Sequence, residues 1–406
     1  MVSINFFSNI NKIKKQKFLV NPNRIGSMRN ATKLLLTLTL FNIFINQSLV
    51  FGNDLVIGFI GGLTSKSSFL EIQESKAALE MLIDETNQRG GVNGRKVRIV
   101  SFDTKGSPSV AYSLMDDLDH ANLDGLIGFY YSNEAVALAS FLERKKVPTI
   151  VVTAASPLIS AGKRFIIQKS ITDDEMGIGL ARKTYEINKR RIIVAKEATS
   201  LAEVAFSSAF ITEFKRLGGK IIDEVNVSLD QGSIGTAAYQ IKEKTNLIDA
   251  VAVFANTLHI AYLWVELERR GVSKDFVTSD SLMFQDPIPV VRFIKDRFKV
   301  LLYPDEFDQS HRTKEFQQFC QRLKKKLPTS HELSANPDYA SETYDAGKIL
   351  LHAFGSTSTT DPEEVMKFVR KTHFNGLSSR VQFDKTGKSK RKTMYLRYDT
   401  GRVISY

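Results

Sequence analysis

Apolar segments and amphipathic segments alternate along most of this chain. The run at 55–60 is continuously apolar, as in a strand that is buried on both faces. The segment after it carries Ala78 and Leu82 at helical spacing and stops at Gly90-Gly91. The same pattern predicts further strands at 97–102, 123–128, 147–153, 191–195, 250–254 and 276–278, and helices at 109–119, 134–145 and 202–217. Strands that alternate with helices indicate an α/β fold built on doubly wound parallel sheets.

The alternation comes in two successive blocks, and the second block begins at about Arg191. Residues 53–406 exceed what one hydrophobic core usually covers. We therefore expect two such lobes.

The first 52 residues differ in composition from the rest, because they contain seven Lys or Arg and no Asp or Glu. The segment 28–33 is basic, an apolar run of 11 residues follows at 34–44, and Val50-Phe51-Gly52 offers the modest side chains of a cleavage site. This order is typical of a secretory signal peptide. A single transmembrane anchor is the alternative, although the run is too short to span a bilayer unaided. We predict a signal peptide at 1–52, with Met28 as an alternative start, and a mature chain that begins near Asn53.

Removal of this segment changes the charge of the chain. Of the 56 basic residues 49 then remain against 44 acidic ones, so the formal net charge falls from +12 to +5. Such a mild excess indicates an ordinary solvated surface and no nucleic-acid partner. The short basic stretches 324–326 and 388–392 are likewise predicted to be solvated faces.

Cys320 is the only cysteine, which excludes an intrachain disulfide and a cysteine-based metal site. It lies far from the signal segment, so we expect no lipid anchor. The prediction is a soluble, monomeric protein in the periplasm.

Motifs of catalysis are missing from the chain. Gly58, Gly61 and Gly62 do not form a dinucleotide fingerprint, and neither a phosphate loop nor a GxSxG motif occurs. The six histidines are scattered without metal-ligand spacing. We therefore predict that the protein is not an enzyme and holds neither a cofactor nor a metal.

A series of short motifs carries a family resemblance. They are Gly90–Asp103 with Ser107-Pro108, Thr153–Pro157, Ile171–Asp174 with Gly177, Tyr344–Ala346, Phe374–Gly376 and Val381–Gly387. In this order they resemble the type I periplasmic binding proteins, and most of all the branched-chain amino acid (leucine/isoleucine/valine) binding proteins of ABC importers. The resemblance covers essentially the whole mature chain.

The resemblance implies two lobes joined by a hinge of three crossover strands, with the ligand in the cleft between the lobes. We place the crossings near Thr172, Leu302 and Lys392. The N-terminal lobe would then hold residues 53–172 and 303–391, and the C-terminal lobe residues 173–302 and 392–406.

Family positions on the N-terminal lobe match Ser132, Ala154 and Ser156. A hydroxyl at Ser132, beside free N–H groups at a helix start, suits a ligand carboxylate. Ser132 or Asn133 can equally cap that helix. Ala154, through its backbone, and Ser156, through its hydroxyl, match positions that hold the ligand's α-substituents. Ser156-Pro157 also fits a helix cap followed by proline at the first helical position.

Family positions on the C-terminal lobe match two acids. Asp280 stands where the family pairs an acid with the ligand's ammonium, and Asp173 stands near that group. A carboxylate that faces a cation in a closed cleft forms a strong pair when the pair is complete. The alternatives are a turn or cap residue at Asp280 and an ordinary helix start at Asp173.

The sequence also departs from the family pattern. Two positions with aromatic rings over the ligand align with Leu201 and with Asn256 or Thr257, and the frequent cysteine pair is absent. Aromatic bulk instead occurs at 129–131, where Phe129 is expected to point into the core, and Phe69 is a candidate for an aromatic wall.

These features predict a solute-binding protein that closes around an amino acid or a related carboxylate or amide and delivers it to an inner-membrane ABC permease. One alternative is a periplasmic sensor or scaffold that contacts a membrane receptor or kinase. The other is a degenerate clamp that binds no small molecule.

Overall fold

The structure is a computed structural model, and it describes residues 54–65, 69–228, 230–279, 281, 298–304, 313–329, 333–334, 337–377, 380–399 and 402–405. Its strands form two larger sheets and a two-stranded ribbon, which consists of β11 (His373–Asn375) and β12 (Arg380–Gln382).

The first sheet has the strand order β2-β1-β3-β4-β5, and every neighbouring pair is parallel. Its strands are β1 (Leu55–Gly61), β2 (Val97–Asp103), β3 (Gly125–Gly128), β4 (Thr149–Val151) and β5 (Ile166–Gln168). All seven residues of β1 are buried, as expected for a central strand with helices on both faces. The strand order reverses between β1 and β3, which is where ligands of such sheets bind.

The second sheet has the order β14-β13-β10-β9-β8-β6-β7. Its strands are β6 (Arg191–Lys196), β7 (Lys220–Asn226), β8 (Ala250–Phe254), β9 (Asp275–Thr278), β10 (Phe298–Pro304), β13 (Thr393–Asp399) and β14 (Arg402–Ser405). Five neighbouring strands, in the order β10-β9-β8-β6-β7, are parallel and repeat the order of the first sheet. The reversal of the strand order therefore lies between β6 and β8. The last two strands are antiparallel additions at one edge.

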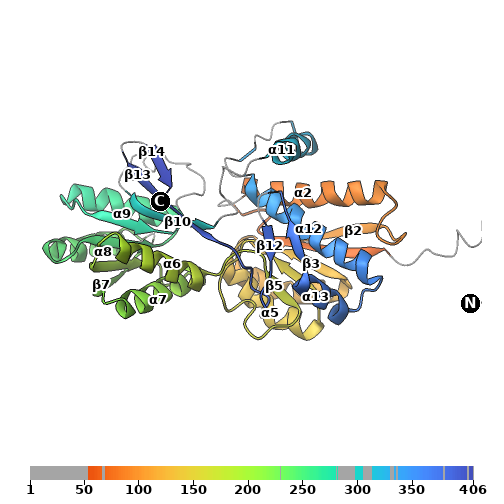
Figure 1. The fold of residues 1–406 in the computed structure, drawn as a ribbon, viewed down its shortest axis with the longest axis horizontal. Helices are drawn as coiled ribbons and strands as arrows, with labels where there is room; N and C mark the ends of the chain where they lie inside the picture. The colour runs from red at the N-terminus through yellow and green to blue at the C-terminus, as the bar shows by residue number, and fades with distance from the viewer. Residues whose placement is uncertain are drawn as a thin grey trace, which may run out of the picture. The chain divides into compact units, whose positions relative to one another are not determined.

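Helices cover both faces of each sheet (Figure 1). On the first sheet, α2 (Phe69–Gln88), α11 (Lys314–Lys326), α12 (Asp338–Thr357) and α13 (Pro362–Lys371) share one buried cluster, and α3 (Pro108–Ser113), α4 (Met115–His120) and α5 (Ser132–Lys145) share another. On the second sheet, α6 (Asp173–Glu186) and α7 (Leu201–Arg216) pack on one face, and α8 (Gln231–Glu243) and α9 (Thr257–Arg269) on the other. Helices α2 and α12 lie side by side although they are far apart in the sequence.

The predicted fold class, α/β with two doubly wound parallel sheets, is confirmed, and each predicted strand coincides with an observed one to within a few residues. The helix predicted at 109–119 is divided into α3 and α4. The Ser113 hydroxyl donates to the Val110 carbonyl (2.8 Å) just before the break, and such a bond competes with the helical ladder.

The segments that join the two sheets pack against each other. Gln168, the last residue of β5, forms a parallel bridge with Lys388, which precedes β13. Lys169 directly follows Gln168, and Arg391 lies three positions after Lys388. Both pair with the carboxylate of Glu342 on α12, and all three side chains are fully buried. A buried ionic cluster therefore holds both crossing segments against the first sheet's helices.

This cluster corrects one prediction. The basic stretch 388–392 is not simply a solvated face, because Arg391 is 9% exposed and its side chain is buried against Glu342. The other basic stretch, 324–326, is exposed as predicted. Strand β10 stays in the second sheet as far as Pro304. None of the helices in the described ranges is both long and apolar enough to cross a bilayer.

Candidate ligand-binding site

The candidate site consists of residues at the carboxyl ends of strands beside the strand-order reversal of each sheet. We call the residues that follow β3 and β4, 129–134 and 153–156, the first wall. The residues that follow β6 and β8, 197–203 and 255–259, form the second wall. Both walls lie at the carboxyl ends of parallel strands, where ligand sites of open α/β sheets occur.

Two serines meet in the first wall. Ser132 is the first residue of α5, and its hydroxyl oxygen accepts a hydrogen bond from the Ser156 backbone N–H (3.1 Å). The Ser156 side chain is fully buried, and its own oxygen has no hydrogen-bond partner among the described residues. This pair places two hydroxyls at the start of a 14-residue helix, where the unpaired backbone N–H groups favour a negative charge.

The capping alternatives for these serines do not hold. Residue Tyr131 stands at the N-cap of α5, and neither Ser132 nor Asn133 supplies a side-chain cap, because both side chains bond to other segments. Residues 157–162 form turns rather than a helix, so Ser156-Pro157 does not start one.

Ala154 lies between these serines and the core. Its side chain is buried, and its N–H donates to the Phe129 carbonyl (3.2 Å). The buried Gln168 amide donates to the carbonyls of both Ala154 (3.1 Å) and Ser156 (3.0 Å). Gln168 therefore fixes the shape of the loop at 154–156, a role that sequence reasoning missed.

Glu134 is a further residue of the first wall that sequence reasoning missed. Its side chain is fully buried, Oε2 accepts from the Thr104 hydroxyl (2.9 Å), and Oε1 has no partner within the described part of the chain. Burial raises the pKa of Glu134 to about 7, and the nearby charge of Asp103 adds to this effect. The first wall therefore contains a carboxyl that is largely neutral below pH 7.

Aromatic residues lie directly after β3. Gly128 has a positive φ of 146°, and a Cβ there would lie 2.0 Å from the Ile60 carbonyl oxygen, so the turn requires glycine. Phe129 is 1% exposed and belongs to the core, as predicted. The Tyr130 ring packs on Tyr339 of α12, with centroids 4.9 Å apart.

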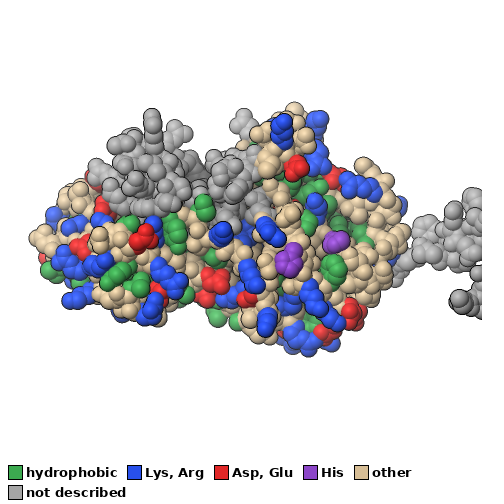
Figure 2. All heavy atoms as spheres, in the orientation of Figure 1, with side chains coloured by type: hydrophobic (Ala, Val, Ile, Leu, Met, Phe, Trp, Pro, Cys, Tyr) green, Lys and Arg blue, Asp and Glu red, His purple; other side chains and the backbone are tan. Residues whose placement is uncertain are grey.

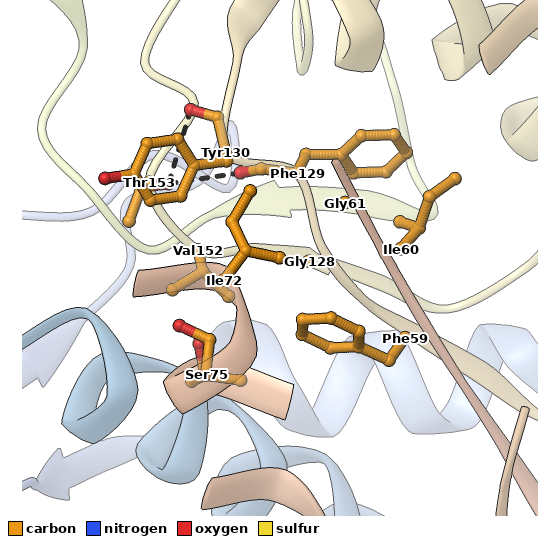
Figure 3. A pocket seen from close by; sticks show the side chains of 11 residues that line it. Phe59, Ile60, Gly61, Ile72, Ser75, Gly128, Phe129, Tyr130, Val152 and Thr153 are labelled. Atoms are coloured by element: carbon orange, nitrogen blue, oxygen red, sulfur yellow. Dashed lines mark hydrogen bonds between the residues drawn. The ribbon is translucent and has the colours of Figure 1, made fainter. Parts of the chain in front are cut away.

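A small apolar cavity lies behind these strand ends (Figure 3). Phe59, Ile72 and Val152 line it, and the Thr153 hydroxyl at its rim donates to the carbonyls of Phe129 (3.2 Å) and Tyr130 (3.4 Å). Its volume of about 20 Å³ has room for roughly one water molecule. The cavity is therefore too small for a whole solute.

The second wall contains an ionisable pair. His259 donates through Nδ1 to Glu197 Oε2 (2.7 Å), which is the tautomer that a carboxylate acceptor requires. Asn256, the N-cap of α9, donates to the same oxygen through its side chain (3.0 Å). Burial alone would raise the pKa of Glu197, but the hydrogen bond and charge of His259 and the Asn256 N–H lower it below its usual value.

Polar groups continue along the second wall. The Ser281 hydroxyl donates to Glu203 Oε1 (3.1 Å), and the Thr257 hydroxyl donates to the Ser281 carbonyl. Neither Leu201 nor any other residue at 197–201 and 255–257 is aromatic. The second wall is thus polar and carries two carboxyl groups.

The Asn133 side chain connects the two walls by hydrogen bonds. Asn133 accepts a hydrogen bond from the Leu201 N–H (3.0 Å) and donates to the Thr199 carbonyl (3.3 Å). The structure therefore brings together Ser132, Ala154 and Ser156 on one side, and Leu201, Asn256 and Thr257 on the other.

Three predicted site residues need separate mention. Asp173 is the first residue of α6, is 5% exposed, and donates its N–H to the Ala155 carbonyl (2.9 Å), so it starts a helix beside the first wall. Asp280 and the side chain of Phe69 lie outside the described residues. Across the residues that the structure describes, no cluster of His, Cys, Asp and Glu is suited to hold a metal.

The fold and the paired strand ends define a class of protein that binds a ligand between two α/β lobes. The chain belongs to the periplasmic binding protein family, whose sequence profile matches residues 54–398.

The chain is also similar to named relatives and to solved structures of solute-binding proteins. Leu/Ile/Val-binding protein homolog 6 of Brucella suis is 21% identical over 298 residues, which cover 71% of this chain and 73% of the relative. A leucine-binding protein of Thermotoga maritima superposes with a TM-score of 0.72 at 20% identity and covers 87% of this chain and 97% of its own. A solute-binding protein of Rhodopseudomonas palustris HaA2, crystallised with p-hydroxybenzoic acid, gives 0.73 at 19% identity, over 87% of this chain and 95% of its own.

Proposed function

We propose that this protein is an exported receptor that closes its two lobes around a small carboxylate-bearing solute and delivers the solute to an ABC importer. The observation that carries the proposal is the pairing of the two walls, each at the carboxyl ends of parallel strands beside the strand-order reversal of its own sheet. The lobes would divide near Thr172, Leu302 and Lys392, and closure would take place about these segments.

The first wall suits the carboxylate of the solute. The hydroxyls of Ser132 and Ser156 lie at the start of α5, and the carboxyl of Glu134 in the same wall is kept largely neutral by burial. Solved relatives were crystallised with leucine, isoleucine, benzoate or 4-hydroxybenzoate, which all carry a carboxylate.

The second wall suits a hydrogen-bond donor or an amine. Glu197 is ionised and Glu203 already accepts a hydroxyl, so a second carboxylate on the ligand would be repelled there. Asp280 is proposed to face an ammonium from the same side. Without aromatic residues at 201 and 256–257, the side chain of the ligand is expected to differ from that of leucine.

Export and delivery complete the proposal. Residues 1–52 would direct the chain across the inner membrane and be removed, and the mature protein would meet its permease in the periplasm. Basic and acidic side chains are interspersed on the face of the molecule that Figure 2 shows, which supports a freely diffusing protein rather than a nucleic-acid-binding one. Sequencing the N-terminus of the protein from a periplasmic fraction tests the cleavage; an intact Met1 would contradict it.

A thermal-shift screen of amino acids, their amides, benzoates and small organic acids tests the binding. We expect a dissociation constant of about 1 μM or tighter, equivalent to about −8 kcal/mol. A solute at 100 times its dissociation constant should stabilise the fold by roughly 2.7 kcal/mol. If no carboxylate raises the melting temperature, the degenerate clamp becomes the better description.

Two substitutions then assign the ends of a confirmed ligand. Ser132→Ala should weaken every carboxylate, whereas Asp280→Asn should weaken only ligands that carry an amine. Calorimetric titration of an amino acid and of its deaminated analogue measures both effects. Full affinity of Asp280→Asn for the amino acid would remove the ammonium assignment.

A further inference from the structure

The side chain of Asn133 forms two hydrogen bonds from the first wall to the second. Asn133 is the second residue of α5, on the first sheet, and both of its amide atoms bond to backbone at the start of α7, on the second sheet. Its Oδ1 accepts from the Leu201 N–H (3.0 Å) and its Nδ2 donates to the Thr199 carbonyl (3.3 Å). The bonded partners are 66 and 68 positions apart in the sequence.

The groups that Asn133 contacts are ones that α7 cannot satisfy by itself. Leu201 is the first residue of that helix, so its N–H has no acceptor within the helix. Ser200, the N-cap, uses its side chain for the Glu203 N–H (3.3 Å) and leaves the Leu201 N–H open. Asn133 therefore completes the N-terminus of α7 from the opposite wall.

The hydrogen bonds of Asn133 indicate that it does not contact the ligand. It follows Ser132 directly, yet its oxygen and nitrogen are both occupied by protein groups when the walls meet. The bonds form only when α5 and α7 approach, since all of the donor and acceptor groups on the other side belong to 199–201. They therefore act on closure and not on the solute.

We propose that Asn133 is a closure latch, a positioning residue that holds the two walls together even before a solute binds. The inference rests on the proposed two-lobed receptor. It adds that part of the closing free energy is built into the protein. Ligand affinity then depends on how often the latch is closed, because a solute that needs the closed form binds in proportion to the closed fraction.

Small-angle X-ray scattering of the purified, ligand-free protein tests this proposal. Asn133→Ala should shift the equilibrium between closed and open forms by about tenfold toward the open form, because two hydrogen bonds are lost. The radius of gyration should rise, while the melting temperature should change little, because Asn133 is not part of the core. Asn133→Asp keeps the acceptor for Leu201 and loses the donor to Thr199, so it should give an intermediate value.

Ser140→Ala supplies a matched control, because Ser140 lies on the exposed side of the same helix. An unchanged radius of gyration for Asn133→Ala would overturn the latch, and so would an equal increase in Ser140→Ala. The measurement needs no solute, so it stands apart from the thermal-shift screen. If Asn133→Ala raised the radius of gyration but no solute raised the melting temperature, the latch would stand and the proposed receptor function would be contradicted.

Discussion

The first and second walls lie at the carboxyl ends of parallel strands in two sheets that share the order of five strands, yet burial and hydrogen bonding shift the pKa of a glutamate in opposite directions in the two walls. Glu134 has one hydroxyl donor, and burial raises its pKa to about 7. Glu197 has an imidazole and an amide as donors, and its pKa lies below the usual value. Shared topology places the site, whereas the few donors that reach each carboxyl decide its charge.

Because of this difference in pKa, the two sides of the proposed cleft differ in charge. Below pH 7 the first wall presents hydroxyls, helix N–H groups and a neutral acid, and the second wall presents an ionised acid. A solute with an anionic end and a donor end would therefore bind in one orientation. Five substitutions test the comparison, beginning with the region that joins the two sheets.

Glu342→Gln is expected to have the largest effect, a loss of about 3–5 kcal/mol in the free energy of unfolding. The substitution leaves Lys169 and Arg391 as buried cations without their shared carboxylate. Urea denaturation measures the loss. Glu364→Gln, at an exposed site on α13, is the control and should change stability by less than about 0.5 kcal/mol. Equal stability of both variants would show that the cluster does not join the sheets.

Glu134→Gln should stabilise the protein at pH 8 by roughly 1–3 kcal/mol and have little effect at pH 5. The pKa of Glu134 is raised in the folded state, so the wild type binds more protons folded than unfolded. The contribution of Glu134 to stability is therefore fully present below the unfolded pKa of 4.5 and is lost as the pH rises toward 7. Melting temperatures of both proteins between pH 5 and pH 8 measure the effect. Parallel curves over this range would contradict a buried neutral acid.

Glu197→Gln should show the opposite dependence on pH, with a loss of about 1 kcal/mol at pH 7. Because the pKa of Glu197 is lowered in the folded state, the carboxylate stabilises the fold above 4.5, and this contribution is lost as the pH falls through the folded pKa. Below that pH the variant and the wild type should converge. If the variant were more stable than the wild type at pH 7, the Glu197 carboxylate would destabilise the fold as Glu134 does, and the proposed difference between the walls would be wrong.

Ser156→Ala is expected to have the smallest effect on the ligand-free protein, within about 0.5 kcal/mol, since the described residues offer its hydroxyl no partner. Ser132→Ala should cost about 1 kcal/mol more, because it removes the acceptor of the Ser156 N–H. Denaturant midpoints distinguish the two. A larger loss for Ser156→Ala would place that hydroxyl in the structure of the loop rather than at the ligand.

The sequence predicted the sheets well because buried parallel strands are continuous apolar runs, as in β1 and β8. It also placed Ser132 and Asn256 at helix starts after such strands, and their role in binding stays a prediction. It missed Glu134 and Gln168, whose burial depends on partners that only the folded chain supplies.

Arg391 is the clearest case of what local patterns do not contain. It stands in a basic stretch that is typical of a solvated surface. Its carboxylate partner, Glu342, lies 49 residues away and on a different element. A charge pattern read along the chain does not reveal a pair that forms across it.

The packing of α12 on α2 has a consequence for how the chain is made. Contacts of this face join residues such as Glu85 and Tyr344, which are 259 positions apart, so the first sheet gains its second helical layer only when most of the polypeptide has been synthesised. Contacts of such long sequence separation form slowly. An emerging chain would therefore remain incompletely folded for most of its synthesis, which is the state that a threading export channel accepts.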